Sequence, residues 1–159
     1  MDDQAAVSIQ SIESVYRKRS EDFFRLALAR TSDPDRARDA VQEGFARAIR
    51  ARIGFRGSGS LEAWICRCVL YATHDPRPSA ALEEPREADD WKPTISDAEV
   101  RAAVGRLPAP QRDVLFLRFY LNYDYLTIAE TLGIEVGTVS ATLHAAREKL
   151  AQALEEVAR

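Results

Sequence analysis

The segment from residue 75 to residue 95 constrains the fold more than any other part of this sequence. It contains four prolines, and its large apolar side chains are nearly limited to Leu82, Trp91 and Ile95. A segment with so few apolar groups cannot bury enough surface to form a core of its own. We therefore expect a domain at residues 1–75, a flexible acidic tether at 76–95 and a second domain at 96–159.

The first domain has the pattern of an all-α unit. Apolar residues recur at steps of three, four and seven through residues 8–30, which predicts one long helix or two short ones. Asp33 followed by Pro34 is typical of a helix start, and three glycines within residues 54–59 interrupt helical structure. We expect the later helices of this domain at residues 34–52 and 61–74.

The second domain also shows only helical signals. Ser96 and Glu99 have the spacing of a capping box, and Pro108 and Pro110 separate two helices. Asp124 can cap a further helix. No segment alternates with a period of two, so we expect an all-α protein with helices at residues 97–107, 110–120, 125–132 and from 136 onward.

Composition excludes several classes of protein. The 159 residues are 46% hydrophobic and 30% charged, as in chains that bury a core. The longest apolar stretches fall short of the roughly 18 residues that a membrane span needs, and the acidic N-terminus lacks the basic region of a signal peptide. We expect a soluble, cytoplasmic protein that does not insert into a membrane.

The sequence contains few residues that could form a metal site or a catalytic site. Cys66 and Cys68, with His74 and His144, are the only cysteines and histidines, and two cysteines two apart on a helix point to nearly opposite sides. We interpret both cysteines as small core residues. No phosphate-binding loop follows a strand, and no nucleophile has a plausible base nearby. The sequence predicts no enzyme, no metal and no cofactor.

Charge is distributed unevenly along the chain. The formal net charge of −3 argues against a protein that coats nucleic acid non-specifically. Residues 15–75, however, carry twelve Lys and Arg against eight Asp and Glu, whereas residues 76–99 carry three against seven. The basic surplus therefore lies in the first domain.

The segment from Tyr125 to Leu143 has the spacing of a helix-turn-helix. Ala129 would lie where two helices cross, Gly133 would permit a left-handed turn, and Val139 would anchor the second helix. An ordinary helical hairpin would also use such residues, so this alternative stays open at the level of spacing.

The last helix presents an unusually neutral outer face. Val139, Leu143, Ala146 and Leu150 form a stripe that we expect to be buried, which leaves Thr138, Ala141, His144, Ala145 and Glu148 facing outward. No lysine or arginine occurs between Arg118 and Arg147, although such side chains supply most of the affinity for DNA. The remaining DNA-binding candidates here are Gly137 and Thr138 at the helix start, with Ser140, Thr142, His144 and Arg147.

The first domain offers two candidate surfaces. One combines aromatic and guanidinium groups suited to stacking unpaired bases and holding phosphates: Phe55, Arg56, Trp64, Arg67 and Tyr71. Trp64 could instead be a core residue, and Arg56 a solvated loop residue. The other is a polar stripe suited to a protein partner, which could equally be a solvated helix face: Asp39, Gln42, Glu43 and Arg47.

Two blocks of sequence resemble a known family. ARDAVQEGFARA at residues 37–48 and FRGSGSLEAWI at 55–65 resemble region 2 of small bacterial sigma factors of the extracytoplasmic-function type. A second set of short motifs resembles region 4 of the same family: LP at 107–108, QR at 111–112, VL at 114–115, LR at 117–118, Tyr125, IAE at 128–130, LGI at 132–134, GTV at 137–139 and AREKL at 146–150.

The resemblance implies partners and roles. Core RNA polymerase, through its clamp helices and flap, promoter DNA and an anti-sigma factor are the implied partners. Asp39, Gln42, Glu43, Phe45 and Arg47 would help to dock on the clamp helices. The segment from Phe55 to His74 would meet the opened minus-ten promoter element, and the helix from Val136 to Arg147 would meet the minus-thirty-five element in the major groove.

The sequence also departs from the family pattern. The family usually carries basic residues where Ser140, Thr142 and Ala145 stand, and an arginine-rich end of region 2 where Pro76-Arg77-Pro78 follows. These departures suit a second hypothesis, a sigma-like protein that binds polymerase or an anti-sigma factor without reading DNA. A stand-alone helix-turn-helix repressor would leave residues 35–65 unexplained.

Overall fold

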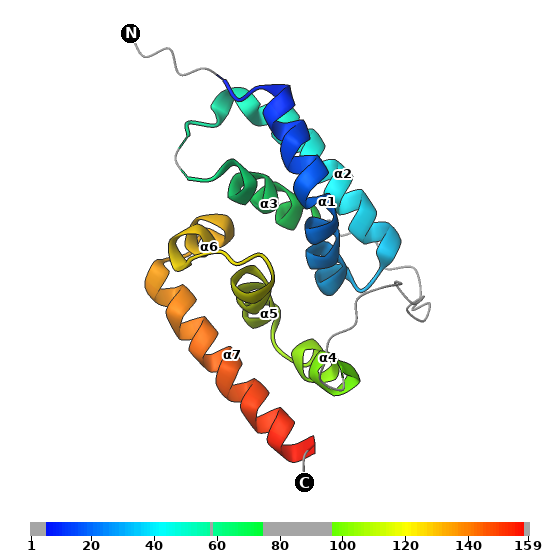
Figure 1. Ribbon diagram of the computed structural model, residues 1–159, viewed down its shortest axis with the longest axis vertical. Helices are drawn as coiled ribbons and strands as arrows, with labels where there is room; N and C mark the ends of the chain where they lie inside the picture. The colour runs from blue at the N-terminus through cyan, green and yellow to red at the C-terminus, as the bar shows by residue number, and fades with distance from the viewer. Residues whose placement is uncertain (1–5, 58, 75–96, 158–159) are drawn as a thin grey trace. The chain divides into compact units, whose positions relative to one another are not determined.

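The computed structural model describes residues 6–57, 59–74 and 97–157, and every regular element within these ranges is helical (Figure 1). The chain divides into two compact units, one built on α1, α2 and α3 and the other on α4, α5 and α7. The predicted all-α class with two helical regions is confirmed. The predicted tether at 76–95 lies outside the described residues.

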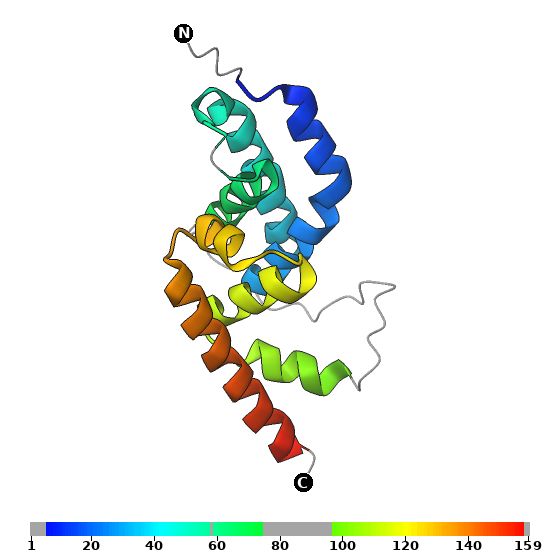
Figure 2. The same cartoon turned by 60° about the vertical axis from the view of Figure 1, so that its left-hand side comes forward.

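Within residues 6–57 and 59–74, the first unit contains three α-helices and one 3-10 turn. The predicted segment at residues 8–30 is one continuous helix. In Figures 1 and 2, α1 and α2 lie side by side, and α3 packs against α2 as well. The elements are α1 (Ile9–Thr31), α2 (Pro34–Ala51), η1 (Arg52–Gly54) and α3 (Leu61–Ala72).

Side-chain caps explain where these helices begin. The Ser8 side chain accepts a hydrogen bond from the backbone N–H of Ser11. Asp33 Oδ1 accepts from the N–H groups two and three residues on, at 2.9 and 3.3 Å, and Pro34 then occupies the first helical position. Ser60 Oγ accepts from the N–H of Ala63 at 3.3 Å. Each cap satisfies a donor that has no partner within the helix.

A close contact between α2 and α3 sets the packing of the first unit. Gly44 faces Val69, and a Cβ placed on Gly44 would lie 2.5 Å from Val69 Cγ2 and 2.6 Å from Val69 Cα. Because part of this contact is backbone, the neighbour cannot rotate away. The same unit fully buries the side chains of Phe23, Leu26 and Ile65. The absence of a side chain at residue 44 therefore lets the two helices approach.

The second unit is built from five helical elements: α4 (Asp97–Gly105), α5 (Ala109–Leu115), a π-helical turn η2 (Phe116–Tyr120), α6 (Tyr125–Leu132) and α7 (Val136–Val157). The helix predicted at 110–120 is thus an α-helix followed by a π-turn. The helix predicted at 97–107 ends at Gly105. Ser96 of the expected capping box lies outside the described residues.

The turn between α6 and α7 has the geometry that a helix-turn-helix requires. Gly133 has a φ of 67°, in the left-handed region that favours glycine, and the N–H of Ile134 donates to the carbonyl of Ala129 at 3.0 Å. The Ile128 and Val139 side chains are fully buried. Gly133 therefore occupies a left-handed turn, and Ala129 and Val139, the other two positions that suggested the motif, are both buried.

Three further findings concern the described residues. None of their helices is both long enough and apolar enough to cross a membrane. No group of three His, Cys, Asp or Glu side chains among them could hold a metal ion. Cys66 is buried and Cys68 half-buried, and burial raises the pKa of the Cys68 thiol.

Gly44→Ala tests the importance of the α2–α3 contact. At an exposed position inside a helix, alanine stabilises the helix by about 1 kcal/mol relative to glycine. At residue 44, however, the methyl group of alanine would overlap the Val69 backbone. We expect the free energy of unfolding, measured by urea denaturation, to fall by about 1–3 kcal/mol. Gly54→Ala is the control, since no atom lies within 4 Å of its added Cβ; equal effects of the two changes would contradict this account.

Candidate functional site

One face of α3 carries a continuous stripe of aromatic and basic side chains. Trp64, Arg67 and Tyr71 lie at helical steps of three and four, so they project from the same side of α3. The seven residues from the first to the last span about 10 Å of helix, and His74 follows in the turn after α3 ends at Ala72. We call these four residues, together with Phe55, the α3 stripe. The structure thereby brings together five of the six DNA-binding candidates of the first domain.

Contacts within the α3 stripe order its side chains. The rings of Phe55 and Trp64 have centroids 5.1 Å apart and are inclined by 44°. Arg67 Nη2 donates to the Tyr71 hydroxyl at 3.1 Å, and its guanidinium lies 5.4 Å from the Tyr71 ring centre. Trp64 is half-buried and Tyr71 is 54% exposed. Trp64 is therefore not a core residue, and the stripe presents flat π-surfaces with adjacent positive charge.

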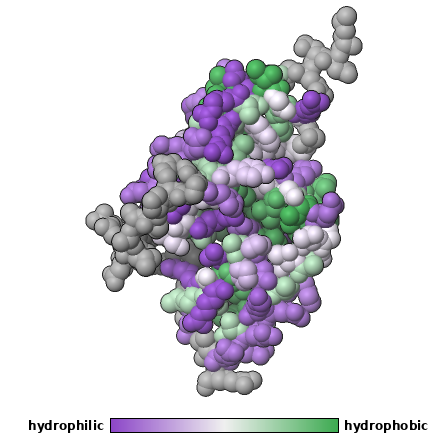
Figure 3. Space-filling model, turned by 180° about the vertical axis from the view of Figure 1, so that it is seen from behind, coloured by the Kyte–Doolittle hydropathy of each residue, from purple (hydrophilic) through white to green (hydrophobic). Residues whose placement is uncertain are grey.

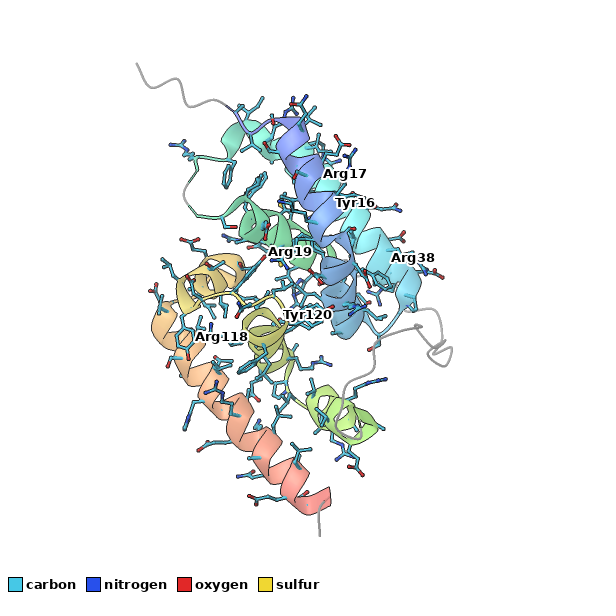
Figure 4. All side chains as sticks on the ribbon, viewed as in Figure 1. Tyr16, Arg17, Arg19, Arg38, Arg118 and Tyr120 are labelled. Atoms are coloured by element: carbon cyan, nitrogen blue, oxygen red, sulfur yellow. The ribbon has the colours of Figure 1, made fainter. Side chains whose placement is uncertain are left out.

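The loop that precedes α3 presents Arg56. Arg56 is exposed, and Gly57 and Gly59 adopt φ values of 70° and 88° that a side chain would strain. Behind this loop, Arg19 of α1 bonds Glu62 in the first turn of α3 at 3.2 Å and Asp22 at 3.1 Å. Figure 4 labels Arg19 on α1. This ion-pair network ties the start of α3 to α1.

The polar stripe on α2 forms a second surface. Asp39, Gln42 and Arg47 are exposed, and Glu43 is half-buried. Glu43 Oε1 accepts from Arg47 Nε at 3.0 Å and from Arg50 Nη2 at 2.9 Å. The hydrogen bond from Arg47, followed by that from Arg50, lowers the pKa of Glu43. Exposed ion pairs of this kind add little stability, so the network mainly orders the charged groups on the surface.

Phe45, which the family resemblance names together with the polar stripe for clamp docking, does not share the polar face of α2. Its side chain is buried, with ring centroids 5.0 Å from Tyr16 in an edge-to-face arrangement and 6.0 Å from Phe23. A residue two positions after Glu43 projects to nearly the opposite side of the helix. Phe45 therefore packs α2 against α1, where Figure 4 labels Tyr16, and cannot offer its ring to a partner on the polar face.

The outer face of α7 matches the expected neutral surface. Val139, Leu143 and Ala146 are buried and Leu150 is half-buried. The residues expected to face outward are exposed except Ala145, which is half-buried; of the other candidates, Gly137 and Ser140 are exposed and Thr142 is half-buried. His144 Nε2 lies 3.3 Å from Glu148 Oε1. The N-terminal half of α7 thus offers hydroxyl groups and backbone N–H groups, but no cation.

The two arginines that border this region have aromatic partners that were not predicted from the sequence. The Arg147 guanidinium lies 5.2 Å from the ring centre of Phe119, which is itself 60% exposed. Arg118 donates to the carbonyl of Tyr123 at 3.0 Å and lies 5.6 Å from the Tyr125 ring centre. Arg118, labelled in Figure 4, therefore contacts the segment from Tyr123 to Tyr125 that leads into α6 and helps to hold it in place.

Exposed apolar side chains occur in both units. They include Ile53 at 76%, Phe119 and Leu126 at 60%, and Ile9 at 52%. Figure 3 shows one face of the molecule, on which hydrophobic residues gather in separate areas between hydrophilic ones. Single exposed apolar residues are common in soluble folds, so they define no site without a further observation.

Family models match most of the described chain. Residues 15–76 match the model described as Sigma-70 region 2, and residues 97–150 match Sigma-70, region 4. The first match contains α2, α3 and the loop between them, and the second contains α4 to α6 and most of α7. The α3 stripe, the α2 surface and the outer face of α7 described above therefore all lie within matched segments.

Individual relatives agree with these models. The ECF RNA polymerase sigma factor EcfG of Rhodopseudomonas palustris is 30% identical over 142 residues, which cover 80% of this chain and 76% of the relative. The RNA polymerase sigma factor YlaC of Bacillus subtilis is 26% identical over 157 residues, covering 88% and 90%.

A solved structure shares the fold. It is the sigma factor RpoE in complex with the anti-sigma factor NepR from Bartonella quintana, with a TM-score of 0.72, 19% identity, and coverage of 92% of this chain and 98% of that one. At this identity the likeness concerns the fold alone.

The Glu43 network gives a prediction about pH. Because hydrogen bonds from Arg47 and Arg50 lower its pKa, Glu43 favours the folded state above its unfolded pKa, and this contribution disappears as the pH falls through the folded value. In Arg47→Gln, we expect NMR titration to show the pKa of Glu43 returning towards its ordinary value. Arg17→Gln, which removes the partner of Glu13 on α1, should leave it unchanged; an unmoved Glu43 in Arg47→Gln would contradict the network.

Proposed function

This chain belongs to the extracytoplasmic-function sigma factors of the sigma-70 family, which direct RNA polymerase in transcription initiation, and we propose that the α3 stripe captures the opened minus-ten element of its promoters. Sigma factors have no catalytic chemistry of their own. Their task is to place polymerase at a promoter and to help open the duplex. The proposal thus concerns binding surfaces.

The observation that carries this proposal is the regular alternation of π-surfaces and guanidinium groups on one helix face. Unpaired bases stack on aromatic side chains, and each such contact contributes about 1–3 kcal/mol with little dependence on sequence. The Phe55–Trp64 pair offers ring surfaces, while Arg67 and the exposed Arg56 supply charge for phosphates. A duplex hides its bases, so this surface favours a strand whose bases are already separated.

The α2 surface supports docking on the clamp helices of core polymerase. Asp39, Gln42, Glu43 and Arg47 are accessible on one side of α2, and the ion pairs around Glu43 hold charges of both signs in fixed positions. Electrostatic complementarity of this kind sets the orientation of a partner more than the affinity. Phe45 would act from behind, by holding α2 against α1. The flap of polymerase would engage the second unit.

The helix-turn-helix supports binding of the minus-thirty-five element by α7. Gly137 and Thr138 offer backbone N–H groups at the helix start, and Ser140, Thr142 and His144 offer hydrogen-bonding side chains. The first basic side chain on this helix is Arg147. Binding by α7 alone would therefore be weak, and polymerase would have to hold it at the promoter.

An anti-sigma factor is a further expected partner. The solved relative with the shared fold is bound to an anti-sigma factor, which supports the same kind of control for this chain. Such a partner would compete with polymerase or DNA for the surfaces above. We expect this regulation, like the action of the sigma factor itself, to take place in the cytoplasm.

Run-off transcription with core polymerase on genomic fragments tests the proposed role. Wild-type protein should direct initiation at a discrete set of promoters. Trp64→Ala should reduce promoter opening about ten-fold or more by removing a stacking surface, while it still co-purifies with core polymerase. Arg17→Ala, on the exposed side of α1, is the matched control. Full promoter opening by a folded Trp64→Ala protein would refute the assigned role of the stripe.

The neutral face of α7 predicts how the free protein binds duplex DNA. Without polymerase, we expect weak binding with a shallow dependence on salt, because few phosphates are neutralised. Ser140→Lys with Thr142→Arg should strengthen binding to all sequences and steepen the plot of log affinity against log salt by about two units. Steep salt dependence of the wild-type protein in a filter-binding assay would contradict this prediction.

A further inference from the structure

We propose that Phe119 of the π-helical turn η2 is a positioning residue, which holds the Arg147 guanidinium ready to bind a phosphate of the promoter backbone. The inference rests on the proposed function, because the phosphate belongs to the duplex that α7 contacts at the minus-thirty-five element. Arg147 is the first basic side chain on α7. Phe119 lies outside that helix, in the turn that follows α5.

An aromatic ring, and no carboxylate, holds the Arg147 side chain. Its guanidinium carbon lies 5.2 Å from the centre of the Phe119 ring. Within the ranges that the structure describes, no hydrogen bond or ion pair joins this guanidinium to another residue. A phenyl ring attracts a cation through its π-face, but it has no charge and offers no lone pair to N–H groups. Phe119 therefore orders the arginine and leaves its charge and its five donors for a ligand.

Other arginines of the chain are ordered by carboxylates. Arg17 and Arg47 each bond a glutamate four residues earlier, at 2.6 and 3.0 Å. A phosphate would have to compete with the carboxylate for such a guanidinium. The glutamate that follows Arg147, Glu148, lies 3.3 Å from His144 instead. Arg147 thus keeps a charge that no carboxylate of the described residues offsets.

The π-turn explains why so large a ring is exposed. The side chains of Leu117 and Leu121 are buried, and the N–H of Leu121 donates to the carbonyl of Phe116, five residues earlier, at 3.2 Å. These contacts fix the turn from its inner side. Phe119 lies between the two leucines and remains 60% exposed. Single π-turns often occur at functional sites, and this one presents the ring where Arg147 meets it.

The position of Arg147 along α7 argues for a DNA phosphate as its ligand. Ser140, His144 and Arg147 lie at helical steps of four and three, so they share one side of the helix, and all three are exposed. About 15 Å of helix separate Arg147 from the N–H groups near Gly137. The major groove of B-DNA is about 12 Å wide. A helix in this groove would reach one backbone with its start and the opposite backbone with Arg147.

The test measures how the polymerase holoenzyme binds a promoter fragment, mapped by run-off transcription, at several salt concentrations. Arg147→Gln should weaken binding about five- to ten-fold and make the salt slope shallower by about 0.9 units, as the loss of one duplex phosphate contact predicts. Phe119→Leu keeps an apolar side chain but removes the π-face, so we expect about two- to five-fold weaker binding. Phe119→Tyr keeps the ring and should bind as wild type.

Leu126→Ala is the matched control, because it shortens another side chain of the same unit that is 60% exposed. It should change neither affinity nor salt slope. Phe119→Gln, a polar replacement at this exposed site, is a second variant that should behave as Phe119→Leu does. Equal melting temperatures and equal retention of core polymerase would show that each variant folds and assembles normally.

A double-mutant cycle separates positioning from a structural role of Phe119. In the Arg147→Gln background, Phe119→Leu should have no further effect on DNA binding, because the ring acts only through the arginine. Additive effects of the two changes would refute the positioning role. Uncharged methylphosphonates, placed one at a time in the minus-thirty-five element, locate the contact. One of them should weaken binding by the wild-type protein but not by the Arg147→Gln protein.

Different outcomes separate this proposal from the proposed function. If replacing the minus-thirty-five sequence weakens wild-type binding, but the Phe119 and Arg147 variants bind as wild type, the positioned phosphate contact is refuted and the role of α7 stands. If replacing that sequence has no effect, recognition of the element by α7 is itself refuted. If Phe119→Leu weakens retention of core polymerase or of an anti-sigma factor, but not of DNA, the ring serves a protein partner and our assignment is wrong.

Discussion

The approach of α2 to α3 at Gly44 and Val69 is the contact on which the first unit depends. With no side chain at residue 44, the two helices meet at a separation that a single methyl group would not permit. That contact fixes the rotation of each helix about its own axis. Because side chains three and four apart share a face, it also decides that Trp64, Arg67 and Tyr71 point away from α2, and that Asp39 and Gln42 point away from α3.

The two proposed surfaces therefore share one core. Phe45 lies behind the polar face of α2, and it packs on Tyr16 and Phe23 of α1. Arg19 joins α1 to the first turn of α3 through Glu62. Polymerase docking and strand capture would thus use opposite sides of a close-packed set of helices. Close-packed interiors have low compressibility, so a displacement of one helix is transmitted to its neighbours. A partner that holds α2 in place would hold the α3 stripe in place as well.

Local signals in the sequence predicted the elements better than the contacts between them. Asp33 with Pro34, Ser60 and Gly133 determine starts and turns through their own backbone chemistry, and each lies where it was expected. Phe45 is buried although the resemblance groups it with exposed residues, because a family motif contains both surface residues and the core residues that support them. The contact of Arg30 with His74 was missed because the two residues are 44 positions apart, and the role of Gly44 was missed because it exists only when α3 is present. The π-turn at η2 has no sequence signal that we recognise.

The uncharged face of α7 is compatible with promoter recognition if affinity and selectivity come from different parts of the complex. When polymerase holds both units on one promoter, the binding of α7 becomes an intramolecular event. The high effective concentration of α7 at the DNA then compensates for its low intrinsic affinity. Phosphate contacts position a protein but carry no sequence information. A helix with few phosphate contacts gains little binding energy at non-specific DNA sequences. Its hydroxyl and backbone N–H groups therefore contribute mainly at sites where the base edges and the backbone geometry fit. In such a protein, weak binding by the isolated helix-turn-helix reduces competition from non-specific DNA.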